Sequence, residues 1–192
     1  MVRTRPTWNE QFLEIAYVVA KRATCLRRGF GAVIVNPKTH QIISTGYCGN
    51  ASGIKDCIDL GKCYRDMIGA PSGVLYDLCN SIHAEENAIM QAGKERCLGN
   101  VIYVTGIDFT EENNLFYGKP CYKCESKIIT AGLEEIIFFN KNCKKIKDIK
   151  EENIMKLKVA DVIIGRKNNP FENQEKQVTI LKEKGLQFKE SQ

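Results

Sequence analysis

The sequence predicts one α/β domain in which helices cover both faces of a single sheet. Short apolar segments of strand length alternate with longer segments whose apolar residues recur at helical spacing. No stretch rich in proline, glycine or serine divides the 192 residues, so residues 1–192 are expected to form one domain. With 43% hydrophobic residues, the chain can bury a core of its own.

The first predicted element is an amphipathic helix that ends near Thr24. Thr7 and Glu10 have the spacing of a capping box, in which each side chain bonds the backbone N–H of the other. The apolar residues that follow at helical spacing are Phe12, Ile15, Ala16, Val19, Ala20 and Ala23. Next come two strands at 31–35 and 42–46, which are joined by a polar turn and predict a hairpin.

A long irregular region at 47–80 interrupts this pattern and should need internal fastening. Regular elements then return as helix, strand, helix and strand. Gly93 is the expected end of the first of these helices, and Pro120 the expected start of the second. The predicted segments are 82–92, 101–106, 121–131 and 133–139.

The carboxyl-terminal part is harder to interpret. Residues 140–173 are rich in lysine and have no assigned role, apart from a strand-like run at 159–164. A helix at 174–185 and a short strand at 186–188 are expected to follow. Residues 140–192 hold 13 Lys and Arg against 8 Asp and Glu, which accounts for the whole net charge of +5. Because the signs are mixed and arginine does not cluster, a solvated surface is favoured over a nucleic-acid interface.

Composition also bears on compartment. No apolar run approaches the roughly 18 residues that would span a membrane, and the first residues lack an apolar signal region. The nine cysteines are therefore expected in a reducing cytoplasm, where metal binding or catalysis explains them better than disulfides.

Three residues at the starts of two predicted helices form a candidate metal site. His83 precedes one helix, and Cys121 and Cys124 open the other as a Cys-x-x-Cys pair. Three protein ligands leave one tetrahedral position open, as in catalytic zinc sites, whereas a structural site would have four. Glu85 lies two residues after the histidine and is the expected proton carrier. His40, in the hairpin turn, is expected to be solvated.

Together these residues match the H-x-E…P-C-x-x-C signature of zinc deaminases. Further segments resemble the deoxycytidylate (dCMP) deaminase family, with good coverage from about residue 8 to 139. They include Cys25-Leu-Arg-Arg, Ser44-Thr-Gly-Tyr, the stretch from Arg65 to Gly73 and Ile82-His-Ala-Glu-Glu-Asn-Ala-Ile89.

The resemblance implies a cytidine-deaminase-like three-layer α-β-α sandwich with a mixed five-stranded sheet. It implies hydrolysis of dCMP to dUMP and ammonia, which would feed thymidylate synthesis. It also implies a homo-oligomer, often a hexamer, and frequent allosteric control by dCTP and dTTP. Nucleotide contacts are expected from Arg22, Cys48, Asn50 and Ala84. Cys48 stands where the family usually has asparagine, and it is a weak substitute because a thiol is a poor donor.

Four further cysteines lie on or beside the irregular region, namely Cys25, Cys57, Cys63 and Cys79. Relatives can carry a second, non-catalytic zinc here, and Cys25 and Cys57 match such positions. Four thiolates would close a tetrahedral site and fasten the loop. The alternative is that these cysteines are small buried hydrophobic residues.

Two other functions stay open. A deaminase acting on DNA or RNA could use the basic tail and the polar segment 108–119, although the acids in that segment would repel phosphates. A non-catalytic zinc-binding or regulatory protein could keep the fold, but it would have no need to retain Glu85.

Overall fold

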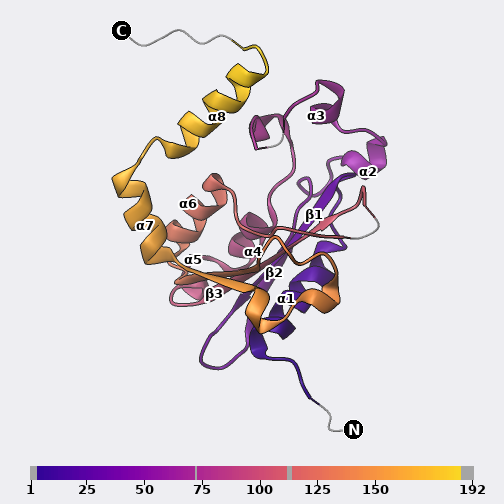
Figure 1. Ribbon diagram of the computed structural model, residues 1–192. Coiled ribbons are helices and arrows are strands. Elements are labelled where there is room, and N and C mark those ends of the chain that lie inside the picture. Colours follow the sequence, from indigo (N-terminus) through magenta and orange to yellow (C-terminus); the bar gives the residue numbers. More distant parts are fainter. Residues whose placement is uncertain (1–3, 72, 112–113, 187–192) are drawn as a thin grey trace.

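A mixed sheet forms the centre of the molecule (Figure 1). In the computed structural model, which describes residues 4–71, 73–111 and 114–186, the main strand order is β2-β1-β3-β5-β6. β1 pairs antiparallel with β2 and β3, β3 runs parallel to β5, and β5 is antiparallel to β6. A short sixth strand, β4, adds to β3 beyond the end of β5. The bounds are β1 Arg28–Val35, β2 Ile42–Tyr47, β3 Val101–Asp108, β4 Asn114–Phe116, β5 Glu135–Phe139 and β6 Ile154–Lys158.

Alternating side chains of the strands build two cores, one on each face of the sheet. Ile34, Ile102 and Ile136 pack on one face with α4 and α6. Val33, Tyr103 and Phe139 pack on the other with α1 and the segment after β5. Because successive strand residues point to opposite faces, this is the three-layer sandwich that the sequence predicts. The helices are α1 Trp8–Ala20, α4 Ala84–Ala92, α5 Lys94–Cys97 and α6 Tyr122–Ala131.

The first helix begins as predicted. Thr7 is its N-cap, and both bonds of the capping box with Glu10 are present. The helix ends at Ala20, four residues before the expected Thr24. Gly93 follows α4, and Cys121 rather than Pro120 caps α6.

The region 47–80 is irregular, with three single-turn helices. These are α2 Cys57–Leu60, α3 Tyr64–Met67 and the 3-10 turn η1 Tyr76–Leu78. A bridge between Gly49 and Ile82 fastens the two ends of the region together. The region is therefore closed at its base, beside the start of α4.

Residues 140–173, which had no assigned role, complete the sheet and add a helix. After two 3-10 turns, η2 Ile146–Asp148 and η3 Glu151–Asn153, strand β6 pairs with β5 from Phe139↔Ile154 to Glu135↔Lys158. The strand predicted at 159–164 is wrong, because these residues form the start of α7 Val159–Asn168. The edge position is already taken by β6, and Val159 and Ile163 pack on the α4–α6 core with helical spacing.

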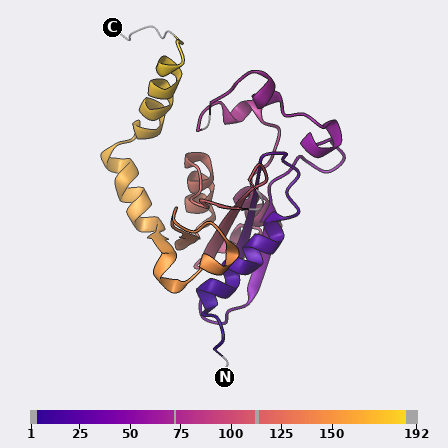
Figure 2. The same ribbon diagram turned by 45° about the vertical axis from the view of Figure 1, so that its right-hand side comes forward.

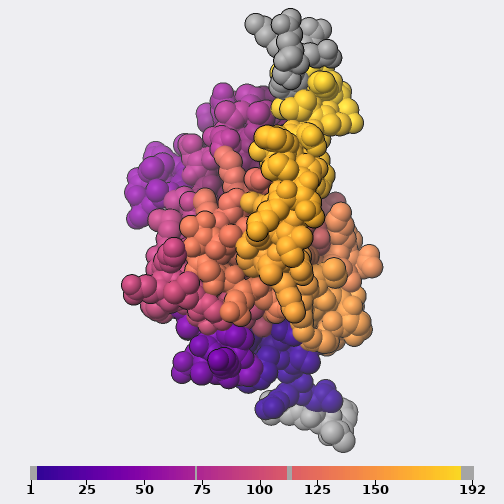
Figure 3. Space-filling view, turned by 90° about the vertical axis from the view of Figure 1, so that its left-hand side faces the viewer, coloured from indigo at the N-terminus to yellow at the C-terminus, as the bar shows by residue number. Residues whose placement is uncertain are grey.

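The last described element, α8 Glu172–Glu183, agrees closely with the helix predicted at 174–185. Figures 1 and 2 show α8 and the segment with α3 rising beyond the same end of the sheet. Figure 3 shows α7 and α8 as a continuous strip on the surface of the molecule. The strand expected at 186–188 falls almost entirely on residues outside those described.

None of the helices in the described ranges combines the length and the apolar character that crossing a membrane would require.

Candidate active site

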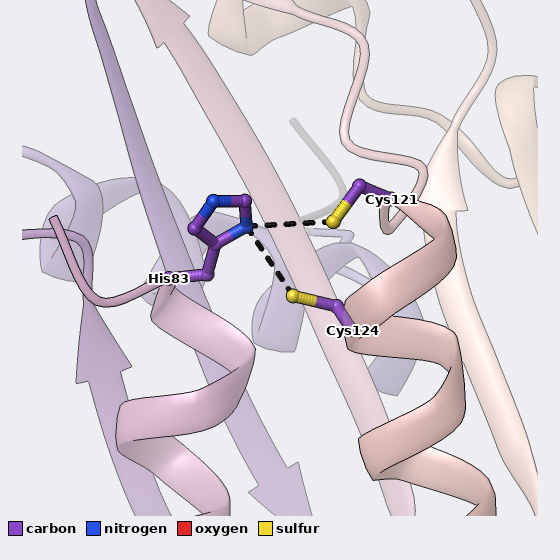
Figure 4. A group of neighbouring side chains, drawn as sticks. All are labelled: His83, Cys121 and Cys124. Carbon is purple, nitrogen blue, oxygen red and sulfur yellow. Dashed lines mark hydrogen bonds between the residues drawn. The ribbon is translucent and has the colours of Figure 1, made fainter. Parts of the chain in front are cut away.

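The starts of α4 and α6 bring together the three predicted metal ligands (Figure 4). His83 and Cys121 are the N-caps of these helices, both with extended backbone, so their side chains lie at the helix ends. His83 Nδ1 lies 3.5 Å from Cys121 Sγ and 3.3 Å from Cys124 Sγ. The two helices meet here because both pack on the same face of the sheet.

The donor set fits zinc. The three ligand atoms lie within 4.8 Å of one another, and no fourth histidine, cysteine or carboxylate of the described residues joins them. One imidazole and two thiols are typical zinc ligands, and three of them leave one tetrahedral position open. Three donors with an open position are typical of catalytic zinc sites, whereas structural sites are closed by a fourth ligand.

The two cysteines share a hydrogen bond that favours ionisation of one of them. The bond from Cys124, together with that from His83, lowers the pKa of Cys121 to about 4. The same bond to Cys121 raises the pKa of Cys124, and burial adds to this. The hydrogen bond with Cys121 likewise raises the pKa of His83 above its ordinary value. The cluster thus favours a thiolate, which is the form that binds metal.

Glu85 lies in the first turn of α4 and is 4% exposed. Burial raises its pKa above the ordinary value for a glutamate, and the charge of His83 opposes part of this increase. A close approach of backbones fixes α4 here, because a Cβ at Gly46 of β2 would lie 2.3 Å from the carbonyl oxygen of Ala84. The start of α4 is therefore held close to β2, and burial favours the protonated form of the Glu85 carboxyl group.

His83, Glu85 and Cys121 line a cavity of about 300 Å³. Its wall includes six predicted site residues from the starts of α4 and α6 and the loop after β2, namely His83, Ala84, Glu85, Cys121, Cys48 and Asn50. Arg22 is not among the lining residues. It is exposed on the surface after α1, with its guanidinium 5.9 Å from the centre of the Tyr47 ring.

Cys48 and Asn50 are both tied to the backbone. The Phe30 N–H donates to Cys48 Sγ at 3.2 Å, and burial raises the pKa of this thiol to about 12. Asn50 Nδ2 donates to the Lys55 carbonyl at 2.8 Å. Cys48 is therefore a neutral, buried part of the wall.

Cys25, Cys57, Cys63 and Cys79 line the same cavity. Burial raises the pKa of Cys57 to about 11, and the thiols of the other three add to the increase. Across the described residues, however, these sulfur atoms do not come as close together as the His83 set does.

The structure adds residues that the sequence alone did not single out. Arg65 and Tyr76 come from the irregular region, and Phe116, Tyr117 and Lys119 come from the segment before Cys121. Arg65 lies in one of the segments that carry the family resemblance, but its type gave no sign that it would be buried. For Phe116, Tyr117 and Lys119, the sequence did offer a signal, because they directly precede the Pro-Cys motif that begins at Pro120.

Segment 140–173 contacts the first turn of α6, beside the site, through Arg166 of α7. Its guanidinium donates to Ser126 Oγ at 2.7 Å, to the Tyr122 carbonyl at 2.7 Å and to Glu125 Oε2 at 2.8 Å. It also stacks on the Tyr122 ring, 3.7 Å from the centre. Tyr122 lies between the two metal-binding cysteines, so α7 braces the turn that carries them.

Comparison with known proteins agrees with this geometry. The sequence profile described as "cytidine and deoxycytidylate deaminase zinc-binding region" matches residues 6–140. The deoxycytidylate deaminase of Schizosaccharomyces pombe is 35% identical over 136 residues, 71% of this chain and 38% of its own length. That of Mycobacterium phage D29 is 34% identical over 140 residues, 70% of this chain and 96% of its own length.

ComE operon protein 2 of Bacillus subtilis is 34% identical over 137 residues, 70% of this chain and 60% of its own length. Among solved structures, the dCMP deaminase of cyanophage S-TIM5 has 21% identity and a TM-score of 0.47, covering 69% of this chain and 82% of that one. The chain thus spans well under two thirds of the fission-yeast relative and nearly all of the D29 phage relative. From the profile match and these identities, the chain belongs to the cytidine and deoxycytidylate deaminase zinc-binding family.

Proposed function

We propose that this protein is a zinc-dependent deaminase that converts dCMP and water to dUMP and ammonia. The observation that carries the proposal is a buried Glu85 in the same cavity as His83 and Cys121. These two residues and the neighbouring Cys124 offer three zinc-type donors with one position open. The relatives named deoxycytidylate deaminase support the choice of substrate.

The residues divide the chemistry between them. His83, Cys121 and Cys124 would hold the zinc, which supplies an activated water at neutral pH. Glu85 takes a proton from the attacking water and delivers it to N3 of the cytosine ring. It then takes the remaining proton from the hydroxyl group added at C4 and passes it to the amino group, so that the C4=O bond forms as the C4–N bond breaks and ammonia leaves. Burial raises the pKa of Glu85, which helps the carboxyl group to hold a proton between the two transfers.

The finer features of this proposal follow the resemblance. Cys48, Asn50 and Ala84 would contact the nucleotide from the cavity wall, and Arg22 would reach its phosphate from outside the wall. The expected state of the protein is a homo-oligomer, such as a hexamer. Its expected effectors are dCTP and dTTP. Its place is the cytoplasm, where it would supply dUMP for thymidylate synthesis.

A second, structural zinc held by Cys25, Cys57, Cys63 and Cys79 is part of the proposal. It is supported by the gathering of these four residues from separate segments into one wall of the cavity. Metal analysis of the purified protein should give two zinc ions per chain. One zinc per chain would refute the second site and leave the catalytic one standing.

A nucleotide panel tests the proposed activity. The protein is assayed with cytidine, deoxycytidine, dCMP and dCTP, with product analysis and with dCTP or dTTP added as effectors. We expect dCMP to be the best substrate, giving dUMP and ammonia in equal amounts. Failure to deaminate any of the four, together with binding to DNA or RNA in a low-salt gel shift, would instead favour the deaminase of polymeric nucleic acid.

A further inference from the structure

Arg65 is a buried cation in the wall of the catalytic cavity. It belongs to the single-turn helix α3 and is 4% exposed, although it carries a full positive charge at neutral pH. Burial of a charge is costly unless an opposite charge and hydrogen bonds compensate for the lost water. The surroundings of Arg65 are therefore informative about what this wall is built to bind.

The protein satisfies this guanidinium only in part. Arg65 Nη2 donates to the carbonyl oxygens of Pro71 and Val74, each at 2.7 Å. The Tyr76 ring lies 4.8 Å from the guanidinium carbon. Arg65 Nε is buried and has no hydrogen-bond partner among the described residues. Two neutral carbonyls and a ring stabilise the cation, but they leave its charge uncompensated.

Two other cations of the cavity wall, Arg27 and Arg28, have acidic partners. Arg27 Nη1 lies 2.5 Å from Asp66 Oδ1, and Arg28 Nε lies 3.5 Å from Asp108 Oδ2. Lys119, which also lines the cavity, is exposed, so water can solvate its charge. In the described ranges, no carboxylate oxygen lies within ion-pair distance of Arg65. Within the described part of the chain, Arg65 is therefore the buried lining cation that has no counter-ion.

The Tyr76 ring lies between the guanidinium of Arg65 and the predicted metal ligand His83. The same ring that packs against Arg65 meets the His83 imidazole edge to face, with ring centres 5.9 Å apart. A single aromatic side chain thus separates the guanidinium from the imidazole, and all three line one cavity. A ligand with its base at Glu85 would extend its anionic end within reach of this wall.

We propose that Arg65 binds the 5′-phosphate of the nucleotide whose base is deaminated at Glu85. This inference rests on the proposed function. It makes the buried Arg65 of the irregular region the residue that distinguishes a nucleotide from a nucleoside. The phosphate would supply the missing negative charge, and a guanidinium is well suited to phosphate oxygens. The bonds to Pro71 and Val74 hold the guanidinium in place before the ligand arrives.

The test compares dCMP with deoxycytidine in wild type, Arg65→Gln and Arg65→Lys. Loss of a charge-assisted contact should lower kcat/KM for dCMP by about 10- to 100-fold. The value for deoxycytidine should change less than about threefold, and Arg65→Lys should fall between wild type and Arg65→Gln for dCMP. Arg27→Gln is the matched control, because it removes an ion pair to the same short helix. Any loss in that variant should fall equally on both substrates.

An equal loss on both substrates in the Arg65 variants would overturn the proposal and make Arg65 a brace for the loop. If Arg65→Gln does not fold, the test uses Arg65→Lys and compares its losses in kcat/KM for dCMP and for deoxycytidine. Calorimetry then also measures the binding of dUMP and of deoxyuridine to this variant. A wild type that deaminates neither substrate would instead reject the proposed function itself. A wild type that deaminates deoxycytidine as well as dCMP would reject only the assignment of Arg65.

Discussion

The two groups of cysteines in this chain are built on different kinds of structure. Cys121 and Cys124 lie at the start of a regular helix, and their sulfur atoms lie within 4.8 Å of each other and of a His83 ring nitrogen. Cys57, Cys63 and Cys79 come from the irregular region and Cys25 from the loop after α1, and their thiols gather in one wall without closing as tightly. The difference indicates that packing of α4 and α6 on the sheet prepares the first site. A metal would have to draw the second one together.

The largest expected effect separates the proton carrier from the metal ligands. Glu85→Gln should lower the deamination rate by about 10²- to 10⁴-fold, because the amide cannot transfer the proton. Its zinc content should stay at the wild-type level. Glu86→Gln is the matched control, since Glu86 is the next residue on α4 and pairs with Lys127 outside the cavity. Substantial turnover by Glu85→Gln would contradict the assignment of this residue.

The next effect concerns the four-cysteine group. Cys63→Ser should reduce the zinc content by one ion per chain and lower the unfolding temperature by about 5 °C or more, since the irregular region loses its fastening. The His83 site should keep its metal. Cys97→Ala, in the core and away from both groups, should leave the zinc content unchanged. Metal analysis and thermal unfolding measure both quantities, and an unchanged zinc content in Cys63→Ser would remove the second site.

The smallest expected effect tests how strongly zinc binding by His83, Cys121 and Cys124 depends on Arg166 of α7. Arg166→Met removes three hydrogen bonds and the stack on Tyr122, and should weaken zinc binding by roughly 10-fold. Competition with a chelating dye measures this affinity. Arg96→Met removes a comparable hydrogen bond to the Ile43 carbonyl of β2 rather than to the first turn of α6, so its zinc affinity should equal that of wild type. Equal affinities in the two variants would show that α7 does not brace the metal-binding turn.

The sequence predicted the parts of the molecule that local rules determine. The capping box of Thr7 and Glu10, the end of α4 at Gly93 and the metal trio all depend on residues close in sequence or on a fixed spacing. The three-layer arrangement followed from the alternation of helices and strands.

The rest depends on contacts between distant segments. Residues 159–164 have a strand-like composition, yet they form a helix because 154–158 already pairs with β5. The burial of Arg65 depends on carbonyls six and nine residues further along an irregular loop, where no periodicity guides prediction. Arg166 reaches α6 across forty or more residues, so its role could not be inferred from its neighbours in the chain.

The donors at the starts of α4 and α6 also couple folding to metal supply. An ion bound there joins residues 83 and 121, and an unfolded chain would lose this link, so zinc binds the folded state in preference. The free energy of unfolding then increases with the logarithm of free zinc concentration once the site begins to fill. The amount of folded protein in a cell would consequently follow zinc availability, as a thermodynamic result of placing the ligands on two separate helices.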